Sequence, residues 1–330
     1  MFDYKTKCSQ GAKPFEIALL RTIQLGACVS SLWGYRGFGA CCRFLKKFIP
    51  ARALTIMLDD NSAFRIPFAD PYWSMLLGGT EIYEPEIEDF LRSLKGEKYT
   101  LIDCGANYGY WSVLTSGKGY GLQRVIAIEP SSATFAILTE NAAINGNRFI
   151  CVQKAIGSRP GIARLSGRKH EARTVSTNAD AHGESVDMIA LDDLIDEVLV
   201  KTDEKIVVKF DVEGLEIAAL SGAAKLLTQD AIVICEDHGS DRHHTVSQHI
   251  LEKTGLKLFC HDAATGTFER VANVATLDRI KRFRNRGYNV FATASPYWEV
   301  KLGAVQRRIN SGAMVRASTS PFAPSARSTS

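Results

Sequence analysis

The sequence contains few of the groupings that mark metal sites, disulfide-rich folds or membrane spans. Its eight cysteines are scattered along 330 residues, with no Cys-x-x-Cys pair and no His/Cys spacing typical of zinc ligands. Cys104, Cys151 and Cys235 lie inside apolar runs, which favours small core residues in a reducing cytoplasm. The longest uncharged stretches, such as 22–35, are too short to cross a bilayer, and the first residues do not resemble a signal peptide.

Acidic residues are missing from the last part of the chain. After Glu299 there are five basic residues and no acid, although the formal net charge of the whole chain is only +4. The rest of the chain therefore carries 4 − 5 = −1, which gives no basic surface for nucleic acid. The basic segment KRFRNRG (281–287) is interpreted as a solvated turn between two strands. The end of the chain, 297–330, is rich in Ser, Ala, Arg and Pro and is predicted to be disordered.

Apolar residues, in contrast, make up 45 % of the sequence, enough for one large core or two small ones. Residues 1–52 are expected to form amphipathic helices, which either pack on the body of the protein or touch a membrane or a partner. Residues 53–98 are predicted to contain a β-hairpin, with strands 53–58 and 63–68 around a polar turn, and a helix that begins at Pro85.

From residue 99 the sequence changes to short β-branched runs that alternate with helical segments, and the main domain is expected to span 99–296. Strands are predicted at 99–104, 124–129, 148–155, 205–211, 231–237, 256–261 and 288–294, and helices at 108–116, 131–145, 214–227 and 243–254. Such alternation indicates an α/β fold with a mostly parallel sheet and helices on both faces. The irregular insertion 157–196 is expected to lie outside the sheet core and to border the active face.

Carboxylates end nearly every predicted strand of this domain. They are Asp103, Glu129, Asp211 with Glu213, and Glu236 with Asp237. Because ligands of open α/β sheets bind beyond the carboxyl ends of the strands, these acids are expected to meet at the binding rim. One acid at a strand end is usually a helix cap. Several at one rim indicate a bound cation or a ligand with several hydroxyls.

A glycine loop, DCGANYGY (103–110), follows the first strand of the domain. Gly105 permits a sharp turn, and Gly109 lets a helix start close to the sheet. Pyrophosphate-binding loops avoid an acid at the position of Asp103, which instead suits an ammonium or sulfonium group. Glu129, 26 residues further on, is placed to accept hydrogen bonds from two ribose hydroxyls. The predicted cofactor is therefore S-adenosylmethionine, a nucleoside with a positively charged amino-acid arm and no phosphate.

With these features the chain resembles the FkbM-type methyltransferases over residues 53–294. The matching motifs are YEPE (83–86), LIDCGANYGYW (101–111), VIAIEP (125–130), the asparagines at 141 and 145, AIG (155–157), LDDL (191–194), KFDVEGLE (209–216) and IVICED (232–237). The resemblance implies a class I methyltransferase fold of seven strands in the order 3-2-1-4-5-7-6, with the last strand antiparallel. It also implies O-methylation of a small molecule, sugar or glycolipid. The expected cofactor-binding residues are Glu84, Asp103, Gly105, Asn107, Gly109, Glu129, Pro130, Ala155 and Asp211.

Four residues after the central strands are the catalytic candidates, namely Lys209, Asp211, Glu213 and His238. Methyl transfer to a hydroxyl requires a group that removes its proton, and a carboxylate or an imidazole near the methyl group can do so. Lys209 lies on the same side of its strand as Asp211 and is expected to hold that carboxylate ionised. The alternative is a structural Lys209–Asp211 pair, with Glu213 as an acid in the first turn of a helix.

No resident metal is predicted. If a divalent ion took part, Asp211, Glu236 and Asp237 would be its ligands, since Mg²⁺ prefers oxygen atoms. Two other functions stay open on the sequence alone: a non-catalytic protein of the same fold that binds a nucleoside or a partner, and a nicotinamide-dependent oxidoreductase. The sequence identifies neither the acceptor nor the oligomeric state.

Overall fold

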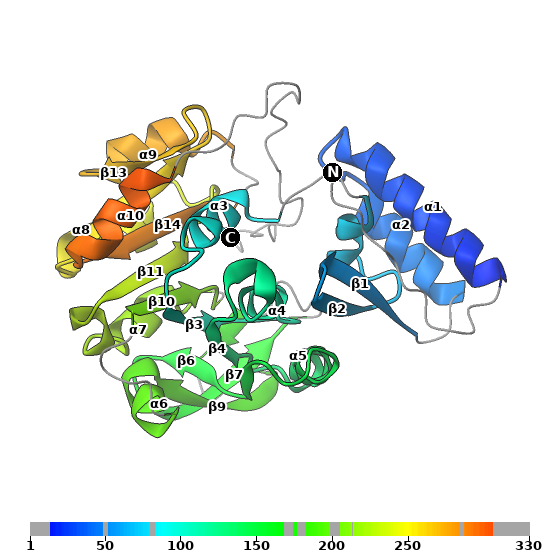
Figure 1. Ribbon diagram of the computed structural model, residues 1–330, viewed down its shortest axis with the longest axis horizontal. Helices are drawn as coiled ribbons and strands as arrows, with labels where there is room; N and C mark the ends of the chain where they lie inside the picture. The colour runs from blue at the N-terminus through cyan, green and yellow to red at the C-terminus, as the bar shows by residue number, and fades with distance from the viewer. Residues whose placement is uncertain are drawn as a thin grey trace.

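The main sheet of the protein has eight strands and runs through the centre of the molecule (Figure 1). The computed structural model describes residues 14–48, 52–78, 83–167, 174–176, 182–198, 205–212, 214–283 and 287–305. The strands of the main sheet are β3 (Tyr99–Cys104), β4 (Arg124–Ile128), β5 (Ile150–Val152), β10 (Lys205–Phe210), β11 (Ala231–Glu236), β12 (Lys257–Asp262), β13 (Thr267–Val271) and β14 (Asn289–Thr293). Their order is β13-β12-β14-β11-β10-β3-β4-β5, with β14 antiparallel to both β11 and β12.

The predicted α/β class is confirmed, but the predicted count of seven strands is wrong, and the observed order differs from the predicted one by an eighth strand beyond β12. The additional strand, β13, pairs antiparallel with β12 at one edge of the sheet. Its sequence, TFERV, has two adjacent charged residues in the middle, and only Val271 is fully buried, because an edge strand is partly open to solvent. This strand has no continuous apolar run, and for that reason it was not predicted from the sequence.

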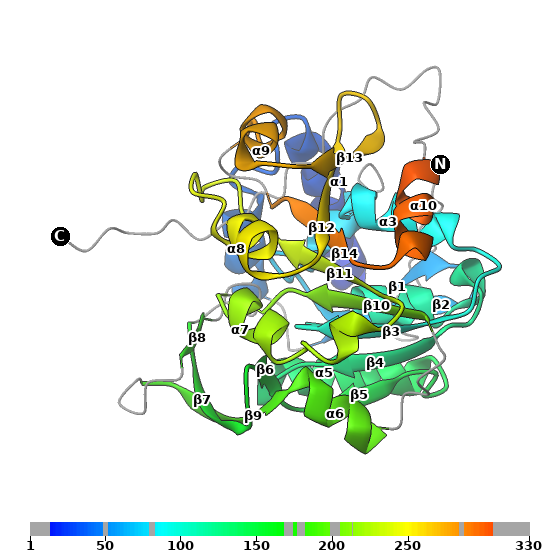
Figure 2. The ribbon, with the colours of Figure 1, turned by 90° about the vertical axis from the view of Figure 1, so that its left-hand side faces the viewer.

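Helices cover both faces of the main sheet, as predicted. Alternate residues of β10 point into two separate cores, with Val207 in one and Ile206 and Val208 in the other. The first core includes residues of α3 (Pro85–Ser93), α4 (Tyr110–Thr115), α5 (Ser132–Ile144) and α10 (Pro296–Ala304). The second includes residues of α6 (Leu191–Val198), α7 (Glu216–Ser221), α8 (Thr245–Lys253) and α9 (Val274–Ile280). Figure 2 shows α3 and α10 on one side of the sheet and α8 on the other.

The insertion 157–196 forms most of a second, four-stranded sheet, which the sequence interpretation did not anticipate. Its strands are β6 (Ala155–Gly157), β7 (Gly161–Ser166), β8 (Thr174–Ser176) and β9 (Glu184–Ala190), in the order β6-β9-β7-β8. Figure 2 shows β7 and β8 projecting at the edge of the molecule. The single strand predicted at 148–155 is divided between the sheets, since β5 belongs to the main one and β6 to the small one.

The expected hairpin is formed by β1 (Ala53–Asp59) and β2 (Ser62–Pro67), whose residues alternate between buried and half-buried positions. The helices expected before it are α1 (Pro14–Ser31) and α2 (Phe38–Leu45), followed by a 3₁₀ turn, η1 (Lys46–Phe48). They lie on the side of the molecule away from α8 and α9 (Figure 1). Among the helices that the structure describes, none combines the length and the apolar character needed to cross a membrane.

Two expectations about exposed segments are wrong. The boundary of the disordered tail at 297 cuts through α10, where Trp298 and Leu302 are completely buried four residues apart on one face of the helix. The segment 281–287 is not simply a solvated turn, because Lys281 is fully buried. Both predictions were wrong for the same reason: Trp298, Leu302 and Lys281 are buried, but their neighbours in the sequence are mostly basic or polar. The rest of the tail, 306–330, lies outside the described residues.

The helix predicted at 214–227 is interrupted. It consists of α7, which ends at Ser221, and a separate 3₁₀ turn, η4 (Leu226–Thr228). A Cβ atom on Gly222 would overlap the carbonyl oxygen of Gly157 in β6. The chain thus needs glycine where α7 meets the second sheet.

Candidate functional site

The glycine loop between β3 and α4 is held against the ends of the neighbouring strands. The amides of Gly105 and Ala106 both donate to the carbonyl oxygen of Ile128 at 2.9 Å. Gly105 has φ +80°, and a Cβ atom there would overlap the backbone oxygen of Asp211. Gly109 has φ +87°, and its Cβ would lie 2.6 Å from Leu138. Both predicted loop glycines are therefore required by backbone conformation and by close approach.

Glu129 lies directly beyond β4 and is 7 % exposed. Its two carboxylate oxygens accept hydrogen bonds from the backbone amides of Asn107 (3.0 Å) and Ser131 (2.9 Å). These bonds orient the carboxylate beside the glycine loop, at the position expected for an acid that binds ribose. Pro130 follows it and is half-buried, whereas Ala155 is buried at the start of β6.

A lysine surrounded by carboxyl groups lies at the ends of β3 and β10. We call Lys209, Asp211, Asp103 and Glu84 the Lys209 cluster. Lys209 donates from Nζ to Asp211 Oδ2 at 2.8 Å, the contact that strand alternation predicted. Burial alone would lower the pKa of Lys209, but the surrounding carboxylates of Asp211, Glu84 and Asp103 outweigh it and raise this pKa. The lysine is consequently charged at any physiological pH.

Asp103 and Asp211 differ in their access to solvent. Asp103 is 2 % exposed and accepts a hydrogen bond from the hydroxyl of Ser112 at 2.7 Å. Burial raises the pKa of Asp103, against the influence of Lys209. The side chain of Asp211 is 26 % exposed. Of these two acids, Asp211 is therefore the one that an incoming substrate can reach, whereas Asp103 is buried.

Glu84 enters this cluster from the other side, at the start of α3. Its φ of 44° and ψ of 66° are in the left-handed region, which is unusual for a residue other than glycine. Its carboxylate accepts hydrogen bonds from Trp111 Nε1 (2.6 Å) and Asn289 Nδ2 (3.0 Å). Burial raises the pKa of Glu84 to about 7; Lys209 opposes this shift and Asp211 adds to it. This carboxyl group therefore titrates near neutral pH.

Aromatic side chains that the sequence interpretation missed lie next to the acids. The hydroxyls of Tyr72 and Tyr83 are 3.0 Å apart, and Trp73 donates from Nε1 to Asn107 Oδ1 at 3.1 Å. Burial raises the pKa of Tyr72, and the charges of Glu84, Asp211 and Glu236 raise it further. The dense aromatic composition of 72–73 and 108–111 was the available signal, but such residues usually form a core.

The charge balance of the Lys209 cluster indicates what it binds. Three carboxyl groups surround one ammonium group, so full ionisation would leave an excess of negative charge in a largely buried place. The raised pKa values of Glu84 and Asp103 are the physical consequence of that arrangement, with burial as the largest cause of each. A ligand with a positive charge would complete the cluster. The residues present thus fit the ammonium and sulfonium groups of the predicted cofactor.

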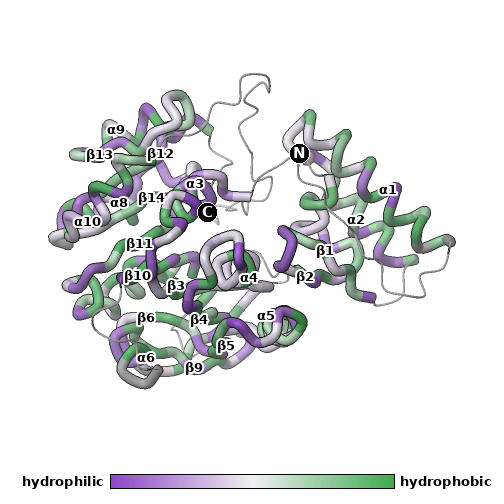
Figure 3. The backbone as a smooth tube through the Cα atoms, in the orientation of Figure 1, coloured by the Kyte–Doolittle hydropathy of each residue, from purple (hydrophilic) through white to green (hydrophobic). Residues whose placement is uncertain are grey.

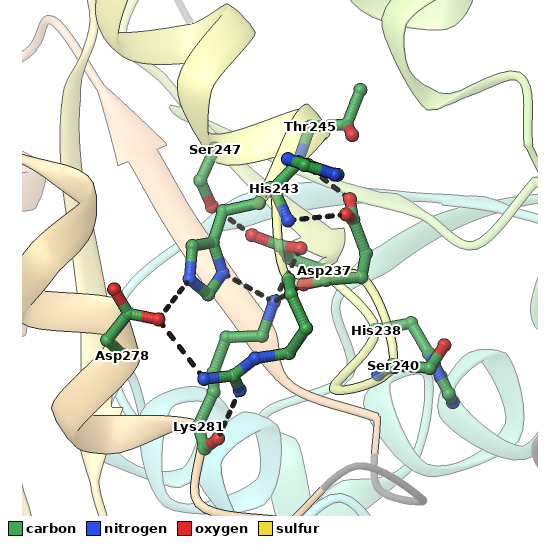
Figure 4. Close-up of polar contacts among 11 residues, drawn as sticks. Asp237, His238, Ser240, His243, Thr245, Ser247, Asp278 and Lys281 are labelled. Carbon is green, nitrogen blue, oxygen red and sulfur yellow. Dashed lines mark hydrogen bonds and ion pairs between the residues drawn. The ribbon is translucent and has the colours of Figure 1, made fainter.

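A second polar group lies beyond β11 (Figure 4), and its side chains are buried. We call Asp237, Lys281, His244 and Ser247 the Asp237 cluster. Asp237 pairs with Lys281 Nζ at 2.8 Å and accepts a hydrogen bond from the hydroxyl of Ser247. Lys281 also donates to His244 Nδ1 at 2.9 Å. Both oxygens of Asp237, a conditional metal ligand in the sequence analysis, are therefore engaged inside the protein.

His238 belongs to the edge of the Asp237 cluster (Figure 4). Its Nδ1 accepts from the backbone amide of Ser240 at 3.1 Å and lies 2.6 Å from the hydroxyl of the same residue. Burial lowers the pKa of His238, and the charge of Lys281 lowers it further. The imidazole is therefore neutral at pH 7, but its Nδ1 lone pair is already engaged.

Two further candidates from the sequence can be placed only in part. Glu236 lies close to Tyr72 and packs against Gly287, where a Cβ atom would overlap its carboxylate. Glu213 lies outside the described residues. In the part of the chain that the structure describes, no three His, Cys, Asp or Glu side chains are grouped as metal ligands would be.

The domain has an α/β fold with a glycine loop, an acid beyond the second strand and a negatively charged cluster at the central strands. These features are typical of a nucleotide-type binding domain suited to a cationic ligand. The Methyltransferase FkbM domain family matches residues 103–288 of this chain. The chain belongs to that family, and the predicted family membership is confirmed. The match covers the glycine loop, the acid Glu129 and the whole Asp237 cluster.

Several solved structures are similar to the chain. The methyltransferase FkbM from Methylobacillus flagellatus KT has 16 % identity and a TM-score of 0.39, over 79 % of this chain and 60 % of that one. The present chain thus spans less than two thirds of that protein. TYW2 from M. jannaschii, in complex with AdoMet, has 14 % identity and a TM-score of 0.38, over 74 % of this chain and 85 % of that one. A search of curated proteins finds no match.

Proposed function

We propose that the protein transfers the methyl group of S-adenosylmethionine to a hydroxyl oxygen of a small molecule, sugar or glycolipid. The observation that carries this proposal is the Lys209 cluster, in which three carboxyl groups surround one lysine. Such a cluster at the central strand ends favours binding of a positively charged ligand. Family membership supports methyl transfer as the reaction class. The choice of oxygen as the acceptor atom rests on the arrangement of Asp211.

Donor binding would use the two sides of the glycine loop. Glu129, oriented by two backbone amides, is placed to accept hydrogen bonds from the ribose hydroxyls. Glu84 and Asp103 supply negative charge for the ammonium and sulfonium groups. Gly105 allows the glycine loop to lie directly against the backbone of Asp211. When bound, the donor supplies an electrophilic methyl group.

Asp211 is the residue that we place at the acceptor hydroxyl. Its side chain is partly exposed, and the buried Lys209 holds it in one orientation at 2.8 Å. A carboxylate so placed can align the acceptor oxygen and receive its proton as the oxygen attacks the methyl carbon. His238 would have to release Ser240 before its Nδ1 could accept a proton. This difference favours Asp211 over His238 as the base.

The test uses purified protein, isotopically labelled S-adenosylmethionine and an extract of the cells that make the protein, with the labelled product identified by mass. Asp211→Asn should lower turnover by about 10²–10⁴-fold while donor affinity changes by less than about tenfold. Asp193→Asn, a change at an exposed acid of α6, is the matched control. Turnover that survives in Asp211→Asn would remove Asp211 from the chemistry. No labelled product with any extract, despite donor binding, would favour a non-catalytic member of the fold.

Removing metal ions with a chelator tests whether a divalent metal takes part in the reaction. If Asp211 accepts the proton itself, treatment with a chelator leaves turnover unchanged. If turnover is lost on chelation and restored by Mg²⁺, Asp211 would be a metal ligand rather than the base.

A further inference from the structure

The N-terminal helices expose an unusual amount of apolar surface. Of the 14 large hydrophobic side chains that are exposed among the described residues, eight lie within 15–48. They are Phe15, Ile17, Leu25, Val29, Leu32, Trp33, Phe44 and Phe48. The other six are distributed singly over the rest of the described chain, as is normal for a protein surface. A local concentration of this kind indicates a contact surface.

Helix α1 is apolar on two opposite sides. Its inner side carries Leu20, Ile23 and Ala27, which are buried in the first core. Its outer side carries Leu25 and Val29, which follow helical spacing and are exposed. Figure 3 shows hydrophobic residues along the length of α1 at the edge of the molecule. The apolar residues of the inner side pack α1 onto the core. The apolar residues of the outer side contribute nothing to this packing and need another explanation.

The segment that carries this apolar surface is also positively charged. The five basic residues of 14–48 are Arg21, Arg36, Arg43, Lys46 and Lys47, and the single acid is Glu16. All five basic side chains are exposed. Phe44 and Phe48 form an exposed edge-to-face pair, with ring centroids 5.2 Å apart, directly beside the two lysines. Aromatic rings next to lysine and arginine are typical of protein surfaces that lie in the headgroup region of an anionic membrane.

We propose that α1, α2 and η1 form a docking surface for an anionic lipid bilayer. The apolar outer side of α1 would enter the boundary between headgroups and acyl chains, while the lysines and arginines contact lipid phosphates. Charge argues against a second copy of this chain as the occupant. A symmetric dimer through this face would bring two segments of net charge +4 together, where like charges repel.

The surface is also connected to the candidate site. Helix α1 packs on the 3₁₀ helix η2 (Trp73–Gly78) so closely that a Cβ atom on Gly78 would lie 3.3 Å from the backbone of Ala27. Trp73, at the start of η2, stacks on Tyr110 with ring centroids 5.5 Å apart and bonds to the glycine loop through Asn107. Docking would hold the aromatic side of the site close to the bilayer.

The protein contains its own probe for this proposal. Trp33 is 64 % exposed, whereas Trp73, Trp111 and Trp298 are 3 % exposed or less. With the full chain, vesicles of phosphatidylcholine containing about 30 % phosphatidylglycerol should shift the Trp33 emission to shorter wavelength, and pure phosphatidylcholine should have a weaker effect. Lipids that carry a fluorescence quencher should quench it. The variant Trp33→Phe should lose the shift.

Matched variants identify the surface. Leu25→Asp combined with Leu32→Asp should weaken vesicle binding in a sedimentation assay by at least about tenfold. Ile162→Asp combined with Val300→Asp changes equally exposed residues elsewhere and should leave binding within about twofold. Lys46→Glu with Lys47→Glu should lower affinity for anionic vesicles by at least about tenfold, whereas Lys95→Glu with Lys253→Glu should not. Unchanged melting temperatures would verify that each variant is folded.

Four results would overturn the proposal. The first is wild-type protein that stays in the supernatant with anionic vesicles. The second is an equal loss of binding in the control variants. The third is a Trp33 emission maximum typical of a buried indole before lipid is added, which would mean that another part of this chain covers the surface. The fourth is a wild-type dimer, measured by light scattering, that Leu25→Asp with Leu32→Asp converts to monomer, since the face would then be a self-association surface.

Discussion

Two buried lysines, Lys209 in β10 and Lys281 directly after α9, have very different surroundings. Lys209 faces three carboxyl groups, one of which, Asp211, has a side chain that is 26 % exposed. Lys281 is fully buried, pairs with the fully enclosed Asp237, and also contacts His244. One cluster has too much negative charge and an opening, whereas the other is balanced and closed.

This difference distinguishes a binding site from a structural ion pair. A buried pair with all of its hydrogen bonds made gains nothing from a ligand, and its role is to hold β11, α8 and the segment after α9 together. In an unbalanced cluster, full ionisation of the carboxyl groups is unfavourable unless a cation is bound. The raised pKa values of Glu84 and Asp103 reflect this. Acids that look equivalent at strand ends in the sequence can therefore have opposite roles.

The largest expected effect comes from breaking the closed cluster. Lys281→Met should lower the free energy of unfolding by about 3–5 kcal/mol, because it leaves Asp237 charged and unpaired in the interior. Lys209→Met should cost only about 1–3 kcal/mol, because Asp211 reaches solvent and its neighbours can take up protons. Urea denaturation measures both, with the exposed Lys95→Met as the control. Equal losses for the two buried lysines would contradict the comparison.

A smaller effect is expected at the donor site itself. Glu129→Ala should weaken binding of S-adenosylmethionine by about 1.5–3 kcal/mol, the scale of losing charge-assisted hydrogen bonds to ribose. Calorimetric titration measures it. Glu140→Ala, at an acid of α5 whose side chain is 55 % exposed, should leave the affinity unchanged. Unchanged affinity in a folded Glu129→Ala protein would remove this residue from the donor site.

The pH dependence of donor binding should report on Glu84. Its pKa is about 7, so raising the pH through 7 ionises the carboxyl group and strengthens its attraction for the ammonium of the donor. Donor affinity should rise by about tenfold, or about 1.4 kcal/mol, between about pH 5.5 and about pH 7.5. Glu84→Gln cannot ionise and should flatten this rise. A wild-type affinity that is independent of pH would show that Glu84 does not face the donor.

The smallest effect is expected at the edge of the closed cluster. Asp278 is 54 % exposed in its side chain and accepts hydrogen bonds from Arg242 and from His244 Nε2, each at 3.2 Å. Because solvent screens this acid, Asp278→Asn should cost less than about 1 kcal/mol in thermal unfolding. A cost similar to that of Lys281→Met would mean that the ion pair depends on its exposed neighbour.

Much of the fold was predictable because the local sequence pattern determines where most helices and strands form. Periodicity placed the hairpin and the helix at Pro85, and β-branched runs placed the main parallel strands. The edge strand β13 was missed because charged residues interrupt its apolar ones, and the buried part of α10 was missed because only one face of that helix is buried. The second sheet was missed since its short strands pair with residues far away in the chain, for example β6 with β9.

By itself, the sequence determined which residues reach the strand ends. The glycine loop, the acid Glu129 and the two-residue spacing that joins Lys209 to Asp211 are all local, and the structure has them as expected. Only the tertiary structure decided which acid is open and which is sealed. Asp237 is neutralised by Lys281, 44 residues away, and Glu84 receives a hydrogen bond from Asn289, 205 residues away. Electrostatic energy depends on distance in space, and a sequence does not show which distant charges the fold brings together.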